Sequence, residues 1–401
     1  MTFLIKRAVI ISSQMQKREI YLDYAATTPV DPRVAKVVAS LWSKRWGNPS
    51  SAHFSGQAAK VALDRARQTV ADFLGAEAEE IIFTSGATES INLAHKGLIE
   101  GFKKERSEVH LITTKIEHKA VLESCRHLRQ LGWAKIDYLN VSRSGQIDLD
   151  ELAGLIRPET RLVSIGFVNN ELGTIQPIAK IGKFLGELNK KRRKRGGKNI
   201  YFHSDITQAM GHLNIQVYQL GLDLASFSGH KIYAPKGVGG LWVSPEGQFV
   251  PQQNGGGQEE GRRSGTENLG GIVGLAEALT IIKKERKVEQ KRLKKLKQRL
   301  VKKILVAKGV LLLGDQASQA AHIVPLWIEG KDGDSLIMDL SQKGIAASAG
   351  SACSTGRVKT SHVMEAIGLE VKKGGLVRFS LGRWTTEKEI DFAVAALREV
   401  L

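Results

Sequence analysis

Several side chains able to do chemistry stand at the ends of expected strands. The stretch SFSGHK places Ser228 and Lys231 directly after an apolar run. A lysine at the carboxyl edge of a sheet is either an ordinary surface residue or one that can form a Schiff base with a carbonyl compound. In HSDITQ, Asp205 also ends a strand, where an aspartate acts as a structural cap or keeps a pyridinium nitrogen protonated. Together they indicate a candidate site at one sheet edge.

Cys353 is a further candidate for chemistry. It lies in AASAGSACSTG, where no neighbour is larger than serine or threonine. Such a segment builds little core, so the thiol is either a small packed residue or a reactive group. Cys125, the only other cysteine, lies in an amphipathic helical pattern and is interpreted as a core residue. Two cysteines in 401 residues indicate a reducing compartment, and we expect a cytoplasmic location.

The stretch FTSGATES predicts an anion site of low specificity. It ends an apolar run with Ser85 and Gly86 and opens a helix at Thr88. Free backbone N–H groups at a helix start favour a negatively charged ligand. No stretch matches G-x-x-x-x-G-K-S/T or G-x-G-x-x-G, so the two common nucleotide motifs are absent.

Strands and helices alternate along the first two thirds of the chain. Asp31 and Pro32 open a helix to about Trp46, a second covers about 56–74, and β-rich runs then alternate with helical patterns. This predicts an α/β fold with a mostly parallel sheet flanked by helices, with ligands at the carboxyl ends of the strands. A long helical pattern and a smaller alternation follow residue 268. We therefore expect an N-terminal segment packing with the small domain, a large domain, and a small α+β domain carrying Cys353, over residues 1–30, 31–268 and 269–401.

Composition describes a globular protein whose charge is concentrated in two places. Hydrophobic residues make up 42% of the chain, and no apolar run approaches the length of a membrane span, so we expect no membrane association. Residues 190–198 hold seven Lys and Arg without an acid, and residues 283–303 hold twelve against two Glu. The second stretch, with Val288 and Ile304 in an apolar stripe, predicts an amphipathic helix. The cationic faces are either simply solvated or bind an acidic partner such as RNA or an acidic protein.

Nine motifs in this order resemble those of the NifS/IscS-type cysteine desulfurases, pyridoxal-phosphate (PLP) enzymes of the class V aminotransferase family. The resemblance runs from about residue 20 to the C-terminus through YLDYAATTP, FTSGATES, EHKAV, VNNELG, SDITQ, SFSGHKIY, GRRSGTEN, SAGSACSTG and VRFSLGR. It implies PLP-dependent transferase fold type I, the cofactor PLP and a homodimer.

The resemblance also implies roles for single residues. Lys231, Cys353 and His118 would be catalytic, with Lys231 as the Schiff-base lysine, Cys353 as the sulfur carrier, and His118 as acid/base stacked on the ring. The substrate carboxylate would be held by Asn170 and Arg378. The other cofactor-binding residues would be Ala87, Thr88, Asp205, Gln208, Ser228, His230 and, from the second subunit, Thr266.

The implied reaction converts L-cysteine to L-alanine, with sulfur passing as a persulfide on Cys353 to an acceptor in iron–sulfur cluster assembly or tRNA thiolation. The small neighbours of Cys353 would then suit a loop that moves between substrate and acceptor. A selenocysteine lyase or another class V PLP enzyme is the near alternative. From a different class, the alternative is a basic RNA-associated or scaffold protein with a vestigial PLP site. One departure is Glu260, in GGGQEEG, where the family commonly has arginine.

Overall fold

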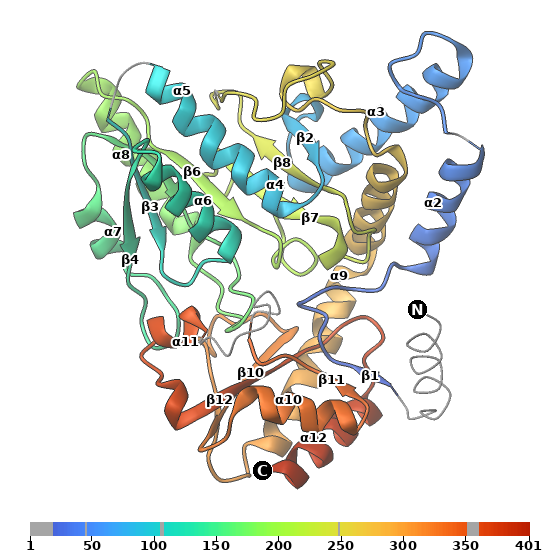
Figure 1. The fold of residues 1–401 in the computed structure, drawn as a ribbon, viewed down its shortest axis with the longest axis vertical. Helices are drawn as coiled ribbons and strands as arrows, with labels where there is room; N and C mark the ends of the chain where they lie inside the picture. Colours follow the sequence, from blue (N-terminus) through green and yellow to red (C-terminus); the bar gives the residue numbers. More distant parts are fainter. Residues whose placement is uncertain (1–18, 45, 105–107, 248, 351–360) are drawn as a thin grey trace, which may run out of the picture.

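The computed structural model describes residues 19–44, 46–104, 108–247, 249–350 and 361–401. Figure 1 shows two bodies, a larger one built around the main sheet and a smaller one that contains the C-terminus. Cys353 lies outside the described residues, so its expected position is not addressed by the structure.

The larger body is organised around one mixed sheet, which among the described residues has seven strands in the order β2-β8-β7-β6-β5-β3-β4. All neighbours pair in parallel except around β8, which runs antiparallel to β2 and β7. The strands are β2 (Ile81–Thr84), β3 (His110–Thr114), β4 (Lys135–Leu139), β5 (Thr160–Ser164), β6 (Tyr201–Asp205), β7 (Leu224–Ser228) and β8 (Gly239–Val243). The mostly parallel α/β sheet predicted from the sequence is therefore confirmed.

Helices cover both faces of this sheet, as the alternation of strand side chains requires. Along β2, Ile82 faces a core with α4 to α6, while Ile81 and Phe83 face a core with α2, α3 and α9. The helical elements are α2 (Pro32–Lys44), α3 (Phe54–Leu74), α4 (Ala87–Asn92), a π-helix (Leu93–Gly97), α5 (Leu98–Lys104), α6 (Lys119–Gln130), α7 (Leu149–Leu155) and α8 (Ile178–Lys194), with 3₁₀ turns at Ala78–Glu80, Gly229–Lys231 and Glu259–Gly261.

Helix boundaries follow local signals in the sequence. Asp31 accepts from the backbone N–H of Arg33 at 2.9 Å and so caps α2, as predicted. The second predicted helix is α3, which ends at Gly75, a residue in the left-handed conformation with φ +68°. The final helix, α12 (Glu387–Val400), begins with a capping box formed by Thr386 and Glu389.

The smaller body packs helices against a three-stranded antiparallel sheet, β12-β10-β9. A short parallel pair, β1 with β11, joins the N-terminal part of the described chain to it, and Ile20 and Leu22 belong to its core. Its elements are β1 (Ile20–Tyr21), β9 (Val310–Leu312), β10 (Ile323–Glu329), α10 (Gly333–Gln342), β11 (Ile345–Ala346), α11 (His362–Ala366), a 3₁₀ turn (Val371–Lys373), β12 (Gly374–Ser380) and α12.

Helix α9 (Leu269–Ile304) runs from one body into the other (Figure 1). Its first half packs in the core of the larger body, called the large domain below, through residues such as Ile272. Its second half packs in the core of the smaller body, called the small domain below, through residues such as Leu296. The domain division expected from the sequence remains a proposal, with α9 as the connection. The apolar stripe predicted for residues 283–303 is wrong at Val288, whose side chain is 73% exposed.

Candidate active site

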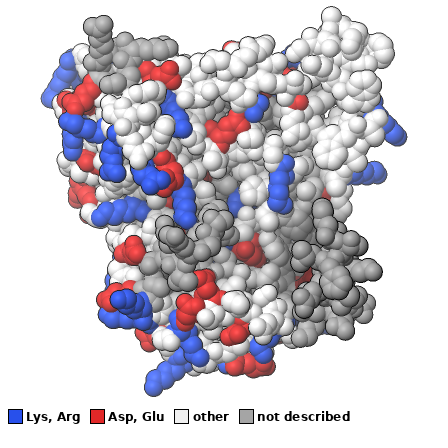
Figure 2. All heavy atoms as spheres, in the orientation of Figure 1, with Lys and Arg blue, Asp and Glu red and all other residues white. Residues whose placement is uncertain are grey.

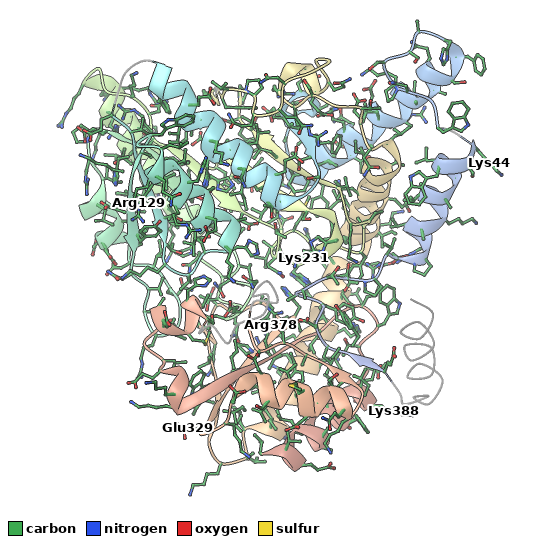
Figure 3. All side chains as sticks on the ribbon, viewed as in Figure 1. Lys44, Arg129, Lys231, Glu329, Arg378 and Lys388 are labelled. Atoms are coloured by element: carbon green, nitrogen blue, oxygen red, sulfur yellow. The ribbon has the colours of Figure 1, made fainter. Side chains whose placement is uncertain are left out.

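A cavity of about 500 Å³ opens where the carboxyl ends of the parallel strands meet the smaller body. Figure 3 shows Lys231 on the large-domain side of this region and Arg378 on the small-domain side. Most residues predicted for the site line this one cavity, namely Ala87, Thr88, His118, Asn170, Asp205, Gln208, Ser228, His230, Lys231 and Arg378.

The amine of Lys231 is held by backbone carbonyl groups. Lys231 ends the 3₁₀ turn that follows β7, and its Nζ donates to the carbonyl oxygens of Ala25 and Ala26 at 2.7 Å each. Both acceptors come from the segment after β1, which the sequence analysis left without a role. The motif YLDYAATTP marks this segment in the sequence. It does not indicate the contact with Lys231, because a residue of any type can supply a backbone carbonyl.

The loop from β2 into α4 forms one wall of the cavity. Gly86 has φ +154°, and a Cβ at this position would lie 3.4 Å from the Ser228 hydroxyl oxygen. Glycine therefore leaves the space between the start of α4 and Ser228 open. On the same wall, burial and the neighbouring Lys231 lower the pKa of His230 to about 4, so this imidazole is neutral. Hydroxyl groups, helix N–H groups and neutral nitrogen donors suit a phosphate.

The ring of His118 is neutral and has a defined tautomer. His118 caps α6, and its Nδ1 accepts from the backbone N–H of Ala120 at 3.1 Å. Burial, followed by the positive charge of Lys231, lowers the pKa of His118, against the opposing effect of Asp205. Since Nδ1 is the acceptor, the proton of the neutral ring is on Nε2, which is a donor.

Arg378 presents a buried guanidinium to the cavity. The residue is 1% exposed, and it donates from Nη2 to Asp23 at 2.8 Å and from Nη1 to the carbonyl of Asn170 at 2.9 Å. Its Nε has no partner within the described part of the chain. A buried N–H without an acceptor is costly, so the site is suited to an anionic ligand. Asp23 belongs to the motif YLDYAATTP, but its pairing with Arg378 was not predicted from the sequence.

Glu117 is a buried carboxyl at the cavity wall that the sequence analysis did not single out. Its Oε1 accepts from the Thr114 hydroxyl at 2.8 Å, and both carboxyl oxygens lie 3.0 Å from the N–H of Gly166. Burial raises the pKa of Glu117 to about 7, and these hydrogen bonds oppose the rise. The only sequence signal was its place before His118.

Two predicted residues are not placed in this cavity. Thr266 is exposed and does not line it, whereas Cys353 lies outside the described residues. Near that segment, the Ser361 hydroxyl donates to the buried carboxylate of Glu171 at 2.5 Å. Glu260, the departure noted in the sequence, is exposed with φ +57° and pairs with Arg262 at 3.2 Å.

The residues around this cavity fit PLP. An amine for its aldehyde, a carboxylate for its ring nitrogen and a donor-rich wall for its phosphate occur together on the cavity wall. The open space at Gly86 and the unpartnered Nε of Arg378 leave room and a donor for the cofactor and an amino-acid carboxylate.

No group of side chains in the described ranges could hold a metal ion, and none of the helices described there is long and apolar enough to cross a membrane.

Many of the basic side chains are used within the fold. Arg192, in α8, donates to the carbonyls of Arg157 and Pro158, and Arg299, in α9, pairs with Asp391. On the face in Figure 2, Lys and Arg are interspersed with Asp and Glu. For part of the two basic stretches, these contacts within the protein account for the basic side chains without an acidic partner.

Comparison with known proteins gives a consistent result. Residues 20–392 match the family model described as Aminotransferase class-V. The chain is 46% identical over 389 residues to the cysteine desulfurase IscS of Escherichia coli, which covers 96% of this chain and 93% of that protein. Among solved structures, a NifS-like protein has a TM-score of 0.87 and 36% identity, covering 96% of this chain and 99% of that chain. SspA in complex with cysteine has a TM-score of 0.79 and 36% identity, covering 92% and 100%.

Proposed function

The chain belongs to the class V aminotransferase family and is a PLP-dependent cysteine desulfurase, and from this premise we propose how its residues divide the reaction. The observation that carries the proposal is the meeting of the Lys231 amine and the Arg378 guanidinium at one cavity, from opposite domains. PLP, when bound, supplies a ring that accepts the electron pair left on an amino acid after its α-proton is removed.

Lys231 would hold the aldehyde end of the cofactor, and its amine would later take the α-proton of the substrate. Asp205 would keep the ring nitrogen protonated and Gln208 would donate to the ring oxygen. The neutral His118 would donate from Nε2, since its Nδ1 is already used by the backbone. The phosphate would be held by Ala87, Thr88, Ser228, His230 and the partner's Thr266.

Arg378 and Asn170 would hold the carboxylate of L-cysteine. The pairing of Arg378 with Asp23 and with the Asn170 carbonyl orients the guanidinium and leaves Nε for the substrate. A planar guanidinium in a fixed orientation selects for a carboxylate and positions the α-carbon.

Cys353 would carry the sulfur. Its thiolate attacks the substrate Sγ, and the new S–S bond forms as the Cβ–Sγ bond of the substrate breaks. The electron pair of that bond stays with Cβ, which takes up a proton, and the carbon skeleton leaves as L-alanine. The persulfide on Cys353 then passes its outer sulfur to an acceptor, for which we propose a protein of iron–sulfur cluster assembly or tRNA thiolation, in the cytoplasm.

These assignments are tested by adding L-cysteine to the purified protein and measuring alanine and sulfide under reductant. We expect Lys231→Ala to lose alanine formation and borohydride labelling, and Cys353→Ser to lose sulfide release while retaining the cofactor. Cys125→Ser is the matched control, because Cys125 is completely buried in the core and away from the cavity. Sulfide release by Cys353→Ser at the parental rate would refute the role of Cys353.

We propose that the active form is a homodimer in which Thr266 completes the partner's site. Thr266 is exposed and lies three residues before the start of α9, and the exposed Trp42 ring lies against Gly270 in the first turn of that helix. Phe54 and Trp46 are also largely exposed, and Figure 2 shows few charges over α2 and α3 at the upper right. Exposed aromatic side chains in an area with few charges are typical of a subunit interface.

A mixing experiment tests the shared site. In a heterodimer of Thr266→Ala and Lys231→Ala chains, one site combines both intact residues only if Thr266 acts across the interface. Random exchange should then restore about a quarter of the sites. No activity above the sum of the two variants alone would place Thr266 outside the partner's site.

A further inference from the structure

A pair of stacked imidazoles lies behind the cavity, where the two domains meet. The rings of His212 and His322 are 3.5 Å apart and within 7° of parallel. His212 follows β6 in the large domain, while His322 directly precedes β10 in the small domain and is 2% exposed. Neither residue lines the cavity.

Hydrogen bonds connect His322 to the cavity through Gln208. The amide nitrogen of Gln208 donates to the carbonyl of Ala25 at 3.0 Å, which turns Oε1 toward His322. That oxygen lies 3.3 Å from His322 Nε2. Since Oε1 can only accept, Nε2 must carry the proton, and the ring is the Nε2–H tautomer. The Ala25 carbonyl is also an acceptor of the Lys231 amine.

The surroundings keep His322 neutral. Burial holds the pKa of His322 well below its usual range, and His212, Lys297 and Arg378 add to this effect. Its Nδ1 is buried without a partner in the described part of the chain, as expected for the lone-pair nitrogen of this tautomer. The ring therefore offers one donor, directed at one acceptor.

Lys297 fixes the backbone that carries His322. Its Nζ donates to the carbonyls of Ala320 and Ile323, both at 3.0 Å, and to the side-chain oxygen of Gln319 at 2.6 Å. These acceptors flank His322 on both sides. Lys297 lies in the half of α9 that packs with the small domain, so the position of His322 is set by that domain.

We propose that His322 is a positioning residue that fixes the amide of Gln208 through its Nε2–H. With Oε1 engaged by His322 and one N–H by Ala25, the second N–H of Gln208 is the one available to the cofactor oxygen. Without this donor the amide can rotate and present its acceptor to the cavity. The inference rests on the proposed role of Gln208, and it links the small domain to cofactor binding.

The test compares PLP affinity and the visible spectrum of the bound cofactor in four variants. His322→Leu removes the donor and keeps bulk, and His322→Gln keeps an N–H near the position of Nε2. His212→Phe retains an aromatic stack without touching Gln208, and Gln208→Leu tests the premise. We expect His322→Leu to weaken PLP binding by about fivefold to tenfold, the effect of losing one buried hydrogen bond, and to shift the spectrum. His322→Gln and His212→Phe should resemble the parent.

The outcomes separate the inference from its premise. Parental affinity and spectrum in His322→Leu, with a weakened Gln208→Leu, would overturn the inference alone. Equal losses in His322→Leu and His322→Gln would also overturn it, because the donor would then be irrelevant. Unchanged binding in Gln208→Leu would remove the premise and the inference together. If His322→Leu fails to fold, ¹⁵N-histidine NMR of the parent decides, since an Nδ1–H tautomer at His322 contradicts the argument.

Discussion

Glu117→Gln is predicted to stabilise the protein in a pH-dependent manner. The carboxyl of Glu117 is buried. Its Oε1 accepts a hydrogen bond from the Thr114 hydroxyl, and both Oε1 and Oε2 accept from the N–H of Gly166. A glutamine can therefore place its carbonyl oxygen at Oε1 and its NH₂ where a protonated Glu117 would carry its hydrogen. The carbonyl oxygen at Oε1 still accepts from both donors, while the NH₂ at the Oε2 position lies 3.0 Å from the Gly166 N–H, a donor–donor contact whose cost does not depend on pH. The pH-dependent effect of the substitution is the loss of the ability to ionise.

The magnitude follows from the pKa of Glu117, which burial raises from 4.5 to about 7. The folded state then binds its proton more tightly than the unfolded state, so stability from this group is full below pH 4.5 and is lost as pH rises toward 7. Each pKa unit corresponds to about 1.4 kcal/mol, so ionising Glu117 costs the folded state about 3 kcal/mol at pH 8. The glutamine variant avoids that cost.

Urea unfolding of parent and variant at pH 5, 6.5 and 8 measures the effect. The difference between the two proteins cancels all other titrating groups. We expect the difference between Glu117→Gln and the parent to move in favour of the variant by about 2–3 kcal/mol between pH 5 and pH 8. Thr114→Val is the opposite perturbation: it removes a hydrogen bond that lowers the pKa of Glu117, so its loss of stability relative to the parent should grow as pH rises. A pH-independent difference for Glu117→Gln would refute the reasoning.

Three further predictions concern charged groups. Arg378→Lys should raise the KM for L-cysteine by about tenfold or more, because an ammonium cannot bond Asp23 and a carboxylate in one plane; an unchanged KM would contradict the clamp. Arg67→Met leaves the buried carboxylate of Glu259 without its cation, and urea unfolding should record a loss of about 3–5 kcal/mol. Replacing the lysines of residues 190–198 by Gln, while leaving the arginines in place, should leave alanine formation unchanged and weaken RNA or acceptor binding; salt-insensitive, unaltered binding would leave only the solvated interpretation.

The fold was predictable because its signals are local. Short β-rich runs located β2 to β7, and Asp31 located the start of α2 within one residue. Strand β8 was not recognised, since its sequence GGLWV has little alternation and two glycines. Its glycines are needed by close contact: a Cβ at Gly240 would lie 2.5 Å from the Phe227 ring. Such a contact depends on the neighbouring strand and is invisible in a single segment.

The candidate site was predictable in its residue types and less so in its pairings. Asp205 ends β6 and Lys231 ends the turn that follows β7, and topology alone brings the ends of neighbouring parallel strands to a common edge. By contrast, Asp23 and Arg378 are 355 positions apart and come together through β1 and β12. The pattern of residues along the sequence does not predict such a contact. The pKa of Glu117 likewise could not be predicted, because it depends on burial that only the packed structure defines.

The segment after β1 explains how one cavity can draw on two domains. Strand β1 pairs with β11 of the small domain, and Asp23 then binds Arg378 there. Two residues later the same segment gives its carbonyls to Lys231 of the large domain. Any displacement of the small domain that carried Arg378 away would pull on Ala25 and hence on the Lys231 amine. The distance between the carboxylate clamp and the amine is thus constrained by a few covalently linked residues in addition to the packing of the two cores.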